Sequence, residues 1–258
     1  MSYLNPPAAC PQLGICLAPL ISIRDRAPAL REPDLMRAVQ TAEAAGADAI
    51  ILSLSARQSL QQHSDIDAAM AAMTQTYLAT PLTQPMIELA SKIRPAAVYF
   101  TAHDSVDSIT ITDTALRLLE QAVRHLTPQS IQLALSLDPF TVQLQAVADA
   151  GVTLVEFQVK KFAGAEPGEH DAQCAALRVA VLAAKRLGMT VHLGHGIDYK
   201  HVVQLATSSG DIAQINVGHA IAARAISVGW ETAVRDMKAL IISACMQSTN
   251  HAAAGVAA

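Results

Sequence analysis

Eight short apolar runs, each followed by a helix-like stretch, alternate along the 258 residues of this chain. Continuous apolar runs are typical of parallel strands that are covered on both faces. Eight strands with eight crossovers predict an α/β fold, a closed (β/α)8 TIM barrel. An open, doubly wound sheet is the alternative, but its glycine-rich turn follows the first strand, and here such turns come last. The expected strands are Leu13–Leu17, Ala49–Leu54, Thr76–Ala79, Ala96–Phe100, Ile131–Leu137, Thr153–Gln158, Met189–Leu193 and Ile212–Val217.

Local signals mark several helix ends between these runs. Glu32-Pro33-Asp34 opens one helix, with the proline expected at its first position. Asp149-Ala150-Gly151 and Arg186-Leu187-Gly188 close two others, because glycine is favoured just after the last helical turn. No linker or shift in composition divides the chain. We therefore expect a single domain over residues 1–258, with an N-terminal arm at 1–12 and a flexible tail at 248–258.

Composition narrows the class of protein. The chain is 52% hydrophobic and 16% charged, which suits a packed α/β domain. Its net charge of −4 and its lack of a Lys/Arg-rich run argue against nucleic-acid binding. Apolar runs stay below the roughly 18 residues that a membrane span needs, and the first residues do not resemble a secretory signal.

The four cysteines, Cys10, Cys16, Cys174 and Cys245, are far apart and have no CxxC spacing. This pattern predicts reduced thiols in a cytoplasmic protein rather than a disulfide framework or a metal site. No sequence motif indicates a cofactor.

Two glycine–histidine turns stand out near the C-terminus, Gly194-His195-Gly196 and Gly218-His219. Each follows an expected strand and precedes a helix-like stretch, the second of which is expected to start at Ala220. Glycine lets backbone N–H groups approach a ligand, and the N-terminus of the following helix favours an anion. In TIM barrels the last two turns commonly hold a phosphate. The pattern predicts a phosphorylated small-molecule ligand.

Other polar residues follow or interrupt the expected strands. Glu156 lies inside a strand, and we expect it to point into the barrel and meet a partner, because an unpaired buried carboxylate is costly. The Arg24 guanidinium can bind a phosphate through two hydrogen bonds, and Lys160 can bind an anion or form a Schiff base. Each also has a purely structural interpretation, as an ion pair or surface residue. Further candidates at the barrel mouth are Cys16, Ser53, Ser55, His103 and Asp138. Burial would leave Cys16 an inert thiol rather than a nucleophile.

The last third of the chain resembles the pyridoxine 5′-phosphate synthase family. The matching segments are Val191–Tyr199, Ile215–Ile221, Arg224-Ala225 and Glu231–Lys238, with weaker matches upstream at Leu13–Ile15, Arg24, Ala45–Asp48, Asp138 and Val155-Glu156. The resemblance implies a (β/α)8 barrel with extra helices that assembles as dimers and octamers. It also implies condensation of 1-deoxy-D-xylulose 5-phosphate with 3-amino-2-oxopropyl phosphate.

By this resemblance, specific roles fall on the turn residues. The phosphate of the product would lie at Gly194, Gly196, Gly218 and His219, and His195 would take part in acid–base work near the ring. Arg24 would match an arginine that one subunit lends to its neighbour's phosphate site.

The first three strands depart from the family pattern. Where the family has acid–base and binding groups, this chain has Cys16, Ala18, Pro19, Ser53, Ser55 and Ala79. Alanine and serine do not shuttle protons near neutral pH, and losing one acid–base group typically costs about 10²–10⁴ in rate. In the family, an arginine-rich loop grips the phosphate of the second substrate. The corresponding segment here, Arg57–His63, carries little charge.

Three functions remain open at this point. The first is an enzyme of altered chemistry that acts on one phosphorylated carbonyl or amino-ketone compound, with His195 as the acid–base group. The second is the family's own synthase reaction. The third is a barrel without turnover that binds a metabolite or a partner subunit. A homodimer or higher homo-oligomer is implied in each case.

Overall fold

The structure is a computed structural model that describes residues 10–26, 29, 32–54, 66–67, 69–71, 75–102, 109–139, 143–165, 168–208 and 211–255. Side chains are described as far as residue 247.

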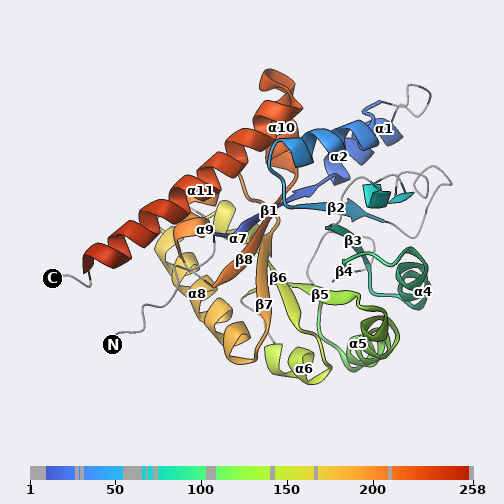
Figure 1. Ribbon diagram of the computed structural model, residues 1–258. Coiled ribbons are helices and arrows are strands. Elements are labelled where there is room, and N and C mark those ends of the chain that lie inside the picture. The colour runs from blue at the N-terminus through green and yellow to red at the C-terminus, as the bar shows by residue number, and fades with distance from the viewer. Residues whose placement is uncertain are drawn as a thin grey trace, which may run out of the picture.

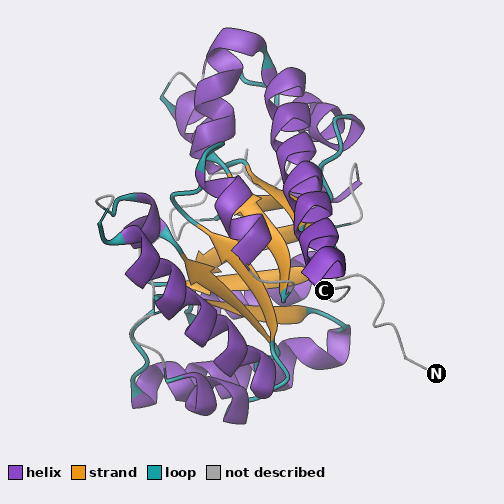
Figure 2. Cartoon of the chain, turned by 90° about the vertical axis from the view of Figure 1, so that its left-hand side faces the viewer, coloured by secondary structure: helices purple, strands orange, loops and turns teal. Residues whose placement is uncertain are grey.

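Eight parallel strands close into one barrel in the order β1 to β8 (Figures 1 and 2). The predicted TIM barrel is therefore confirmed. The ends of the expected strands lie within two residues of the observed ends, and the last strand matches at both ends. The strands are β1 (Gln12–Cys16), β2 (Ala49–Ser53), β3 (Thr76–Pro81), β4 (Ala97–Thr101), β5 (Gln132–Leu137), β6 (Leu154–Gln158), β7 (Thr190–Gly194) and β8 (Ile212–Val217).

Helices surround the barrel, and within the described residues three strands, β1, β6 and β8, are each followed by two helices. These pairs, α1 with α2, α7 with α8, and α10 with α11, are the extra helices that the resemblance implied. The helices are α1 (Ala18–Asp25), α2 (Leu35–Ala44), α4 (Gln84–Ile93), α5 (Asp113–Leu126), α6 (Leu144–Asp149), α7 (Lys160–Ala163), α8 (His170–Arg186), α9 (His201–Ser208), α10 (His219–Val228) and α11 (Trp230–Gly255), with a short 3₁₀ helix η2 (Thr127–Gln129).

The barrel separates two apolar cores because successive strand residues point to opposite faces. Ile50 and Leu52 on β2 belong to the large core between strands and helices. Ala49 and Ile51 on the same strand belong to a small core inside the barrel. That inner core consists mainly of small or aromatic residues: Ala49, Ile51, Tyr77, Ala97, Tyr99, Ala134 and Leu154. The small residues leave interior space for polar side chains of β5 to β8.

Helix ends agree with the sequence at two glycines and differ at one proline. Gly151 and Gly188 have φ of +89° and +75°, the left-handed conformation expected after the ends of α6 and α8. The proposed N1 position of Pro33 is wrong, because α2 begins at Leu35. Asp34 is the N-cap, and its carboxylate accepts a hydrogen bond from the Arg37 backbone N–H.

The last helix, α11, is the longest and lies against α2, α9 and α10 along one side of the barrel (Figure 1). It continues to Gly255, so helical structure extends into the segment expected to be a flexible tail. The tail's mobility stays a prediction. Within the described ranges, no helix combines the length and apolar character required to cross a bilayer.

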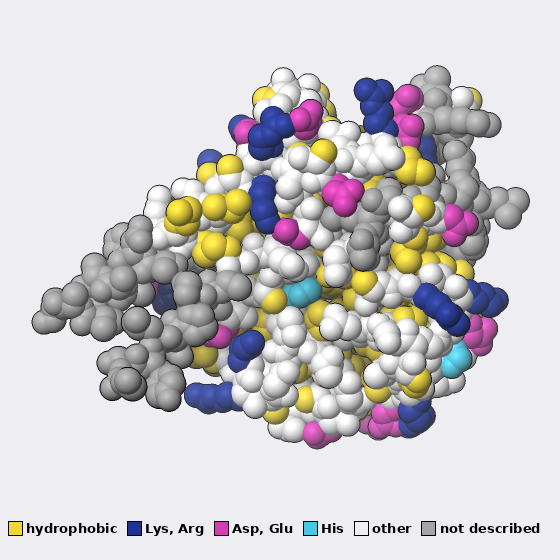
Figure 3. All heavy atoms as spheres, viewed as in Figure 1, with side chains coloured by type: hydrophobic (Ala, Val, Ile, Leu, Met, Phe, Trp, Pro, Cys, Tyr) yellow, Lys and Arg dark blue, Asp and Glu magenta, His cyan; other side chains and the backbone are white. Residues whose placement is uncertain are grey.

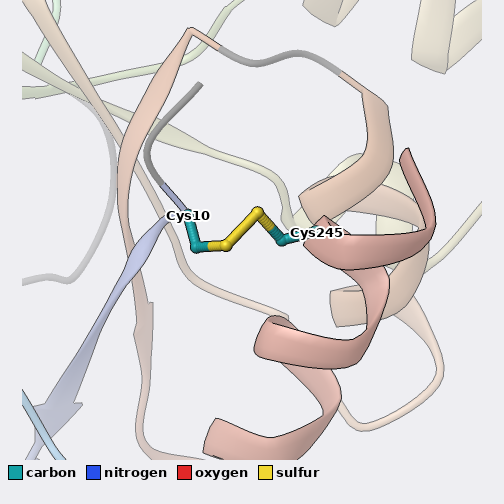
Figure 4. Close-up of a disulfide and its surroundings, with 2 residues drawn as sticks. All are labelled: Cys10 and Cys245. Carbon is teal, nitrogen blue, oxygen red and sulfur yellow. A yellow bond between two sulfur atoms is a disulfide. The ribbon is translucent and has the colours of Figure 1, made fainter. Parts of the chain in front are cut away.

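A disulfide between Cys10 and Cys245 corrects the expectation that all four cysteines are free thiols. Cys10 precedes β1 and Cys245 lies on α11, and Figure 4 shows the two side chains joined. The two residues are 235 positions apart, so no local spacing could reveal the pair, yet their Cα atoms lie 5.6 Å apart. Cys16 and Cys174 are free, as expected. The cytoplasmic prediction consequently loses its support from the cysteines.

We expect Cys10→Ser to lower the free energy of unfolding by about 2–4 kcal/mol, because the bridge restricts the unfolded chain. Cys10 is exposed, so the change removes little packing. Urea unfolding, compared with Cys174→Ser as a control, measures the effect. Four reactive thiols in the unreduced, unfolded protein, instead of two, would contradict the bridge.

Candidate active site at the barrel mouth

A cavity of about 470 Å³ opens at the carboxyl ends of the strands. Its lining includes the last residues of β1, β2, β4 and β8 and the turns after β6, β7 and β8. Cavities of this size and place hold the substrate in barrel enzymes. On the face drawn in Figure 3, Lys and Arg side chains are dispersed among Asp and Glu rather than gathered in one basic patch.

Most of the predicted site residues that the structure describes line this cavity. They are Cys16, Ser53, Glu156, Lys160, His195, Gly196, Gly218 and His219. Three others do not: Gly194 is the buried end of β7, Arg24 is buried on α1, and Asp138 binds Lys161. Ser55 and His103 lie outside the described residues, so their roles stay predictions.

Glu156 on β6 is the buried centre of the site, with 6% of its surface exposed. Its Oε1 accepts a hydrogen bond from Asn216 Nδ2 at 2.7 Å, and its Oε2 accepts one from Ser136 Oγ at 3.1 Å. His195 Nε2 lies 3.4 Å from Oε2. Burial raises the pKa of the Glu156 carboxyl, but its contacts with His195, Asn216 and Ser136 outweigh burial and hold the pKa below its ordinary value. The predicted inward orientation with a partner is observed.

A second tier of amides fixes the direction of these hydrogen bonds. Gln214 Nε2 donates to Asn216 Oδ1 at 2.7 Å, so the Asn216 amide group turns toward Glu156. Gln158 Nε2 donates to Ser136 Oγ at 3.0 Å, so the Ser136 hydroxyl is likewise directed at the carboxylate. Each hydrogen bond of this network is therefore donated in the direction of Glu156. This suits an ionised carboxylate, which only accepts hydrogen bonds.

Two glycines provide the space that this network occupies. Glu156 on β6 reaches Asn216 on β8 across β7 at Gly194, where a Cβ would lie 2.3 Å from Glu156 Oε1. A Cβ at Gly14 on β1 would lie 2.1 Å from Asn216 Oδ1. Because neither position tolerates a side chain, Gly194 serves the carboxylate network in this structure; its predicted phosphate contact is untested.

The turn after β7 places His195 over the carboxylate. His195 has φ of +63°, a left-handed conformation that is uncommon for a residue with a side chain. The next residue, Gly196, has φ of +82°, and its position packs against the backbone of Lys160. His195 thus lines the cavity above Glu156, in the arrangement of an acid–base pair.

Tyr99 and His192 form a polar contact beneath the cavity that sequence reasoning missed. Tyr99 on β4 reaches across the barrel to β7, where its Oη lies 2.5 Å from His192 Nδ1. Burial lowers the pKa of His192 to about 4 and raises that of Tyr99 well above its ordinary value. Both groups are therefore neutral near pH 7. Polar residues at alternate positions of an apolar strand were the available signal.

The turn after β8 leads directly into α10, whose first residue is His219. Gly218 is the N-cap, and no side chain caps the helix there. His219 and Ala220, at the start of the helix, both line the cavity. Backbone N–H groups in the first turn of a helix lack intrahelical partners and favour an anion.

The opposite wall comes from the first strands and carries little chemistry. Cys16 Sγ lies 3.9 Å from Ser53 Oγ, and Ala18, Ile51 and Ala79 complete this side. Burial raises the pKa of the Cys16 thiol despite hydrogen bonds that lower it. Cys16 is thus a protonated thiol near neutral pH, in agreement with the interpretation of an inert residue.

Several residues of the matching segments support the turns instead of lining the cavity. Tyr199 Oη donates to the Ala233 carbonyl at 2.7 Å, and the Arg224 guanidinium lies 4.6 Å from the centre of the Tyr199 ring. Arg224 also pairs with Asp236 at 2.5 Å. Asp198 lines the cavity, while its carboxylate accepts backbone N–H bonds from Lys200 and His201 at the start of α9. These contacts join the β7 turn to α9, α10 and α11.

Three solved structures share this fold at low sequence identity. The tryptophan synthase α subunit from Campylobacter jejuni is 11% identical with a TM-score of 0.58, covering 88% of this chain and 94% of that one. The YdjI aldolase from Escherichia coli K12 is 17% identical with a TM-score of 0.54, covering 92% and 90%. A chain of the Amycolatopsis orientalis BexX/CysO complex is 14% identical with a TM-score of 0.60, covering 85% and 88%. These similarities show the fold alone.

Fold and cavity together define a TIM-barrel protein with an enzyme-like site at the carboxyl ends of its strands. The family model of the pyridoxal phosphate biosynthesis protein PdxJ matches residues 13–243. The chain belongs to the PdxJ family and is a PdxJ-like barrel enzyme.

We expect Gly194→Ala to destabilise the protein by about 1–3 kcal/mol, because the added methyl group must displace the Glu156 carboxylate. Gly168→Ala is the matched control, since nothing lies within 4 Å of a Cβ at that position. Urea unfolding compares the two variants. Equal stabilities would contradict the packing of Glu156 over Gly194.

We expect His192 to make stability depend on pH between its unfolded pKa of about 6.5 and its folded pKa of about 4. In this range the unfolded chain binds the extra proton, so stability falls as pH falls, by at most about 3 kcal/mol. His192→Gln should remove this part of the pH dependence, whereas His125→Gln, an exposed position on α5, should not. Denaturant unfolding at several pH values gives the slope of the unfolding free energy against pH for each variant. Equal slopes for His192→Gln and the parent protein would contradict the attribution of this pH dependence to His192.

Proposed function

We propose that this PdxJ-like enzyme acts on a phosphorylated small carbonyl or amino-ketone compound, with chemistry altered from the family reaction. The observation that carries the proposal is the contrast between the two sides of one cavity. One side has a helix N-terminus without a side-chain cap and a carboxylate–histidine pair. The described part of the other side has only small, apolar, hydroxyl or thiol groups.

The start of α10 supports the phosphate-ester part of the proposal. The N-terminus of α10, which no side chain caps, and the residues His219 and Lys160 all border the same cavity. A phosphate dianion placed there would accept backbone N–H bonds and lie near His219 and Lys160. Two carboxylates, those of Glu156 and Asp198, also line the cavity. The Asp198 carboxylate is already engaged by the backbone N–H groups of Lys200 and His201 and by the His201 side chain.

Glu156 and His195 support an acid–base role. The ionised carboxylate lies against the imidazole and would stabilise its protonated form after the ring takes a proton from substrate. Glu156 is buried and fixed by three contacts, so it would orient the ring. His195 borders the cavity and would exchange the proton itself.

The wall formed by β1 to β3 supports altered chemistry. By resemblance, family members place acid–base groups on these strands, where this chain has Cys16, Ser53 and Ala79. A hydroxyl, an alkyl group and a thiol of raised pKa would not transfer protons efficiently near neutral pH.

The family's own synthase reaction is the second candidate. It is favoured by the extent of the family match, residues 13–243, which covers the barrel and both glycine–histidine turns. It would require that other groups replace those absent from the first three strands.

Self-association remains a further proposal. Exposed apolar side chains lie on α1 (Ile23) and α10 (Ile226 and Val228), two helices that pack together. They supply a surface that a second copy could cover. Arg24, on the same α1 helix, is 4% exposed in the single chain, so lending it to a neighbour would require it to leave that position.

We expect pyridoxine 5′-phosphate to bind more tightly than pyridoxine, and His219→Ala to weaken the phosphate ester by about tenfold, the loss of one charge-assisted contact. Titration calorimetry measures both, with His125→Ala as the control. In parallel, the two family substrates are incubated with the protein and product is followed by chromatography.

The outcomes separate the candidates. Phosphate-dependent binding without product supports altered chemistry. Product formation at the rate of a genuine synthase supports the family reaction and overturns altered chemistry. Equal affinity for both ligands overturns the phosphate-ester site.

A further inference from the structure

Two consecutive lysines after β6 have different surroundings. Lys160 is the first residue of α7 and lines the cavity beside His195 and Gly196. Lys161 is directed to Asp138, with Nζ and Oδ2 2.6 Å apart, and it does not line the cavity. Lys160 therefore belongs to the lining of the candidate site, whereas the Lys161 ammonium pairs with a carboxylate and Lys161 is outside that lining.

The position of Lys160 depends on the neighbouring turn. A Cβ at Gly196 would lie 2.8 Å from Lys160 Cα and 3.3 Å from its Cβ. Gly196 also has φ of +82°, which residues with side chains rarely adopt. Glycine thus lets the His195 turn and the start of α7 pack directly together. As a result, the amine side chain and the imidazole arise from adjoining backbone segments.

The cavity combines three groups that carbonyl chemistry needs. These are a primary amine at Lys160, an imidazole with a buried carboxylate behind it at His195 and Glu156, and an anion-binding helix terminus at His219. A ligand anchored by its phosphate at α10 would have its carbonyl held within a cavity of about 470 Å³ that Lys160 also lines. Such confinement makes a bimolecular addition effectively intramolecular.

We propose that Lys160 forms an imine with a phosphorylated ketone or aldehyde bound in this cavity. The inference rests on the proposed phosphate-ester site and specifies its covalent chemistry. The Lys160 ammonium gives a proton to the His195 imidazole, and the resulting amine nitrogen adds to the carbonyl carbon. A proton then moves from nitrogen to oxygen to give a carbinolamine. The hydroxyl group takes a proton from the His195 imidazolium and leaves as water, which produces a protonated C=N bond. The imine is an electron sink for later bond cleavage or formation at the adjacent carbon.

Borohydride trapping tests the proposal without knowledge of the natural reaction. The full chain is incubated with dihydroxyacetone phosphate, reduced with sodium borohydride, digested, and analysed by mass spectrometry. Reduction converts the imine to a stable secondary amine on the lysine that formed it. We expect modification of Lys160 to exceed that of Lys161 by about tenfold or more.

Matched ligands and variants identify the source of any labelling. Dihydroxyacetone has the carbonyl without the phosphate and should label Lys160 much less, whereas glycerol 3-phosphate has the phosphate without the carbonyl and should compete. Lys160→Arg keeps the positive charge but should abolish the major labelled peptide. Lys161→Arg should leave it intact. Circular dichroism checks that both variants are folded.

Each result decides between the proposals. Equal labelling of the two lysines, or labelling that glycerol 3-phosphate does not reduce, overturns the imine. Calorimetry with glycerol 3-phosphate alone reports the phosphate site separately. Binding without Lys160 labelling overturns only the imine, whereas a lack of binding overturns the phosphate-ester site as well.

Discussion

The buried Glu156 carboxylate is the constraint around which the interior of this barrel is arranged. A charge at that depth is costly unless it is paired and hydrogen-bonded. Here Asn216 and Ser136 donate to it, and Gln214 and Gln158 fix the orientation of those donors. Residues from β5, β6 and β8 therefore depend on one another. Without these hydrogen bonds, the buried carboxylate would destabilise the barrel interior.

The network also explains why the barrel interior contains so little bulk. Gly14 and Gly194 have no side chain where Asn216 and Glu156 pass, and alanines line much of the opposite half. Tyr99 fills the remaining width by reaching His192 from the far side. Together these residues close the barrel below the cavity and leave its mouth open. The polar half and the small-residue half are thus complementary in volume, as close-packed interiors require.

The sequence predicts the fold well because the barrel repeats one local pattern eight times, an apolar run followed by a helix-like stretch. Each apolar run predicts one strand without reference to the others. It also predicts the two glycine–histidine turns and the inward position of Glu156. It does not predict contacts between residues that are far apart in the sequence: the Tyr99–His192 pair spans 93 residues and the Cys10–Cys245 bond spans 235. The error at Pro33 has a local cause. Pro33 was expected at the first helical position, but Asp34 caps the helix, and α2 begins at Leu35.

The bond between Cys10 and Cys245 has a topological consequence for the barrel. Strands β1 and β8 form the seam at which the first and last parts of the chain meet, and that seam relies on backbone hydrogen bonds. The bridge joins the segment before β1 to the helix that follows the β8 unit, so most of the polypeptide becomes a covalent ring. A protease that cuts one exposed loop of this ring would leave a single connected molecule, with both fragments still held at the seam.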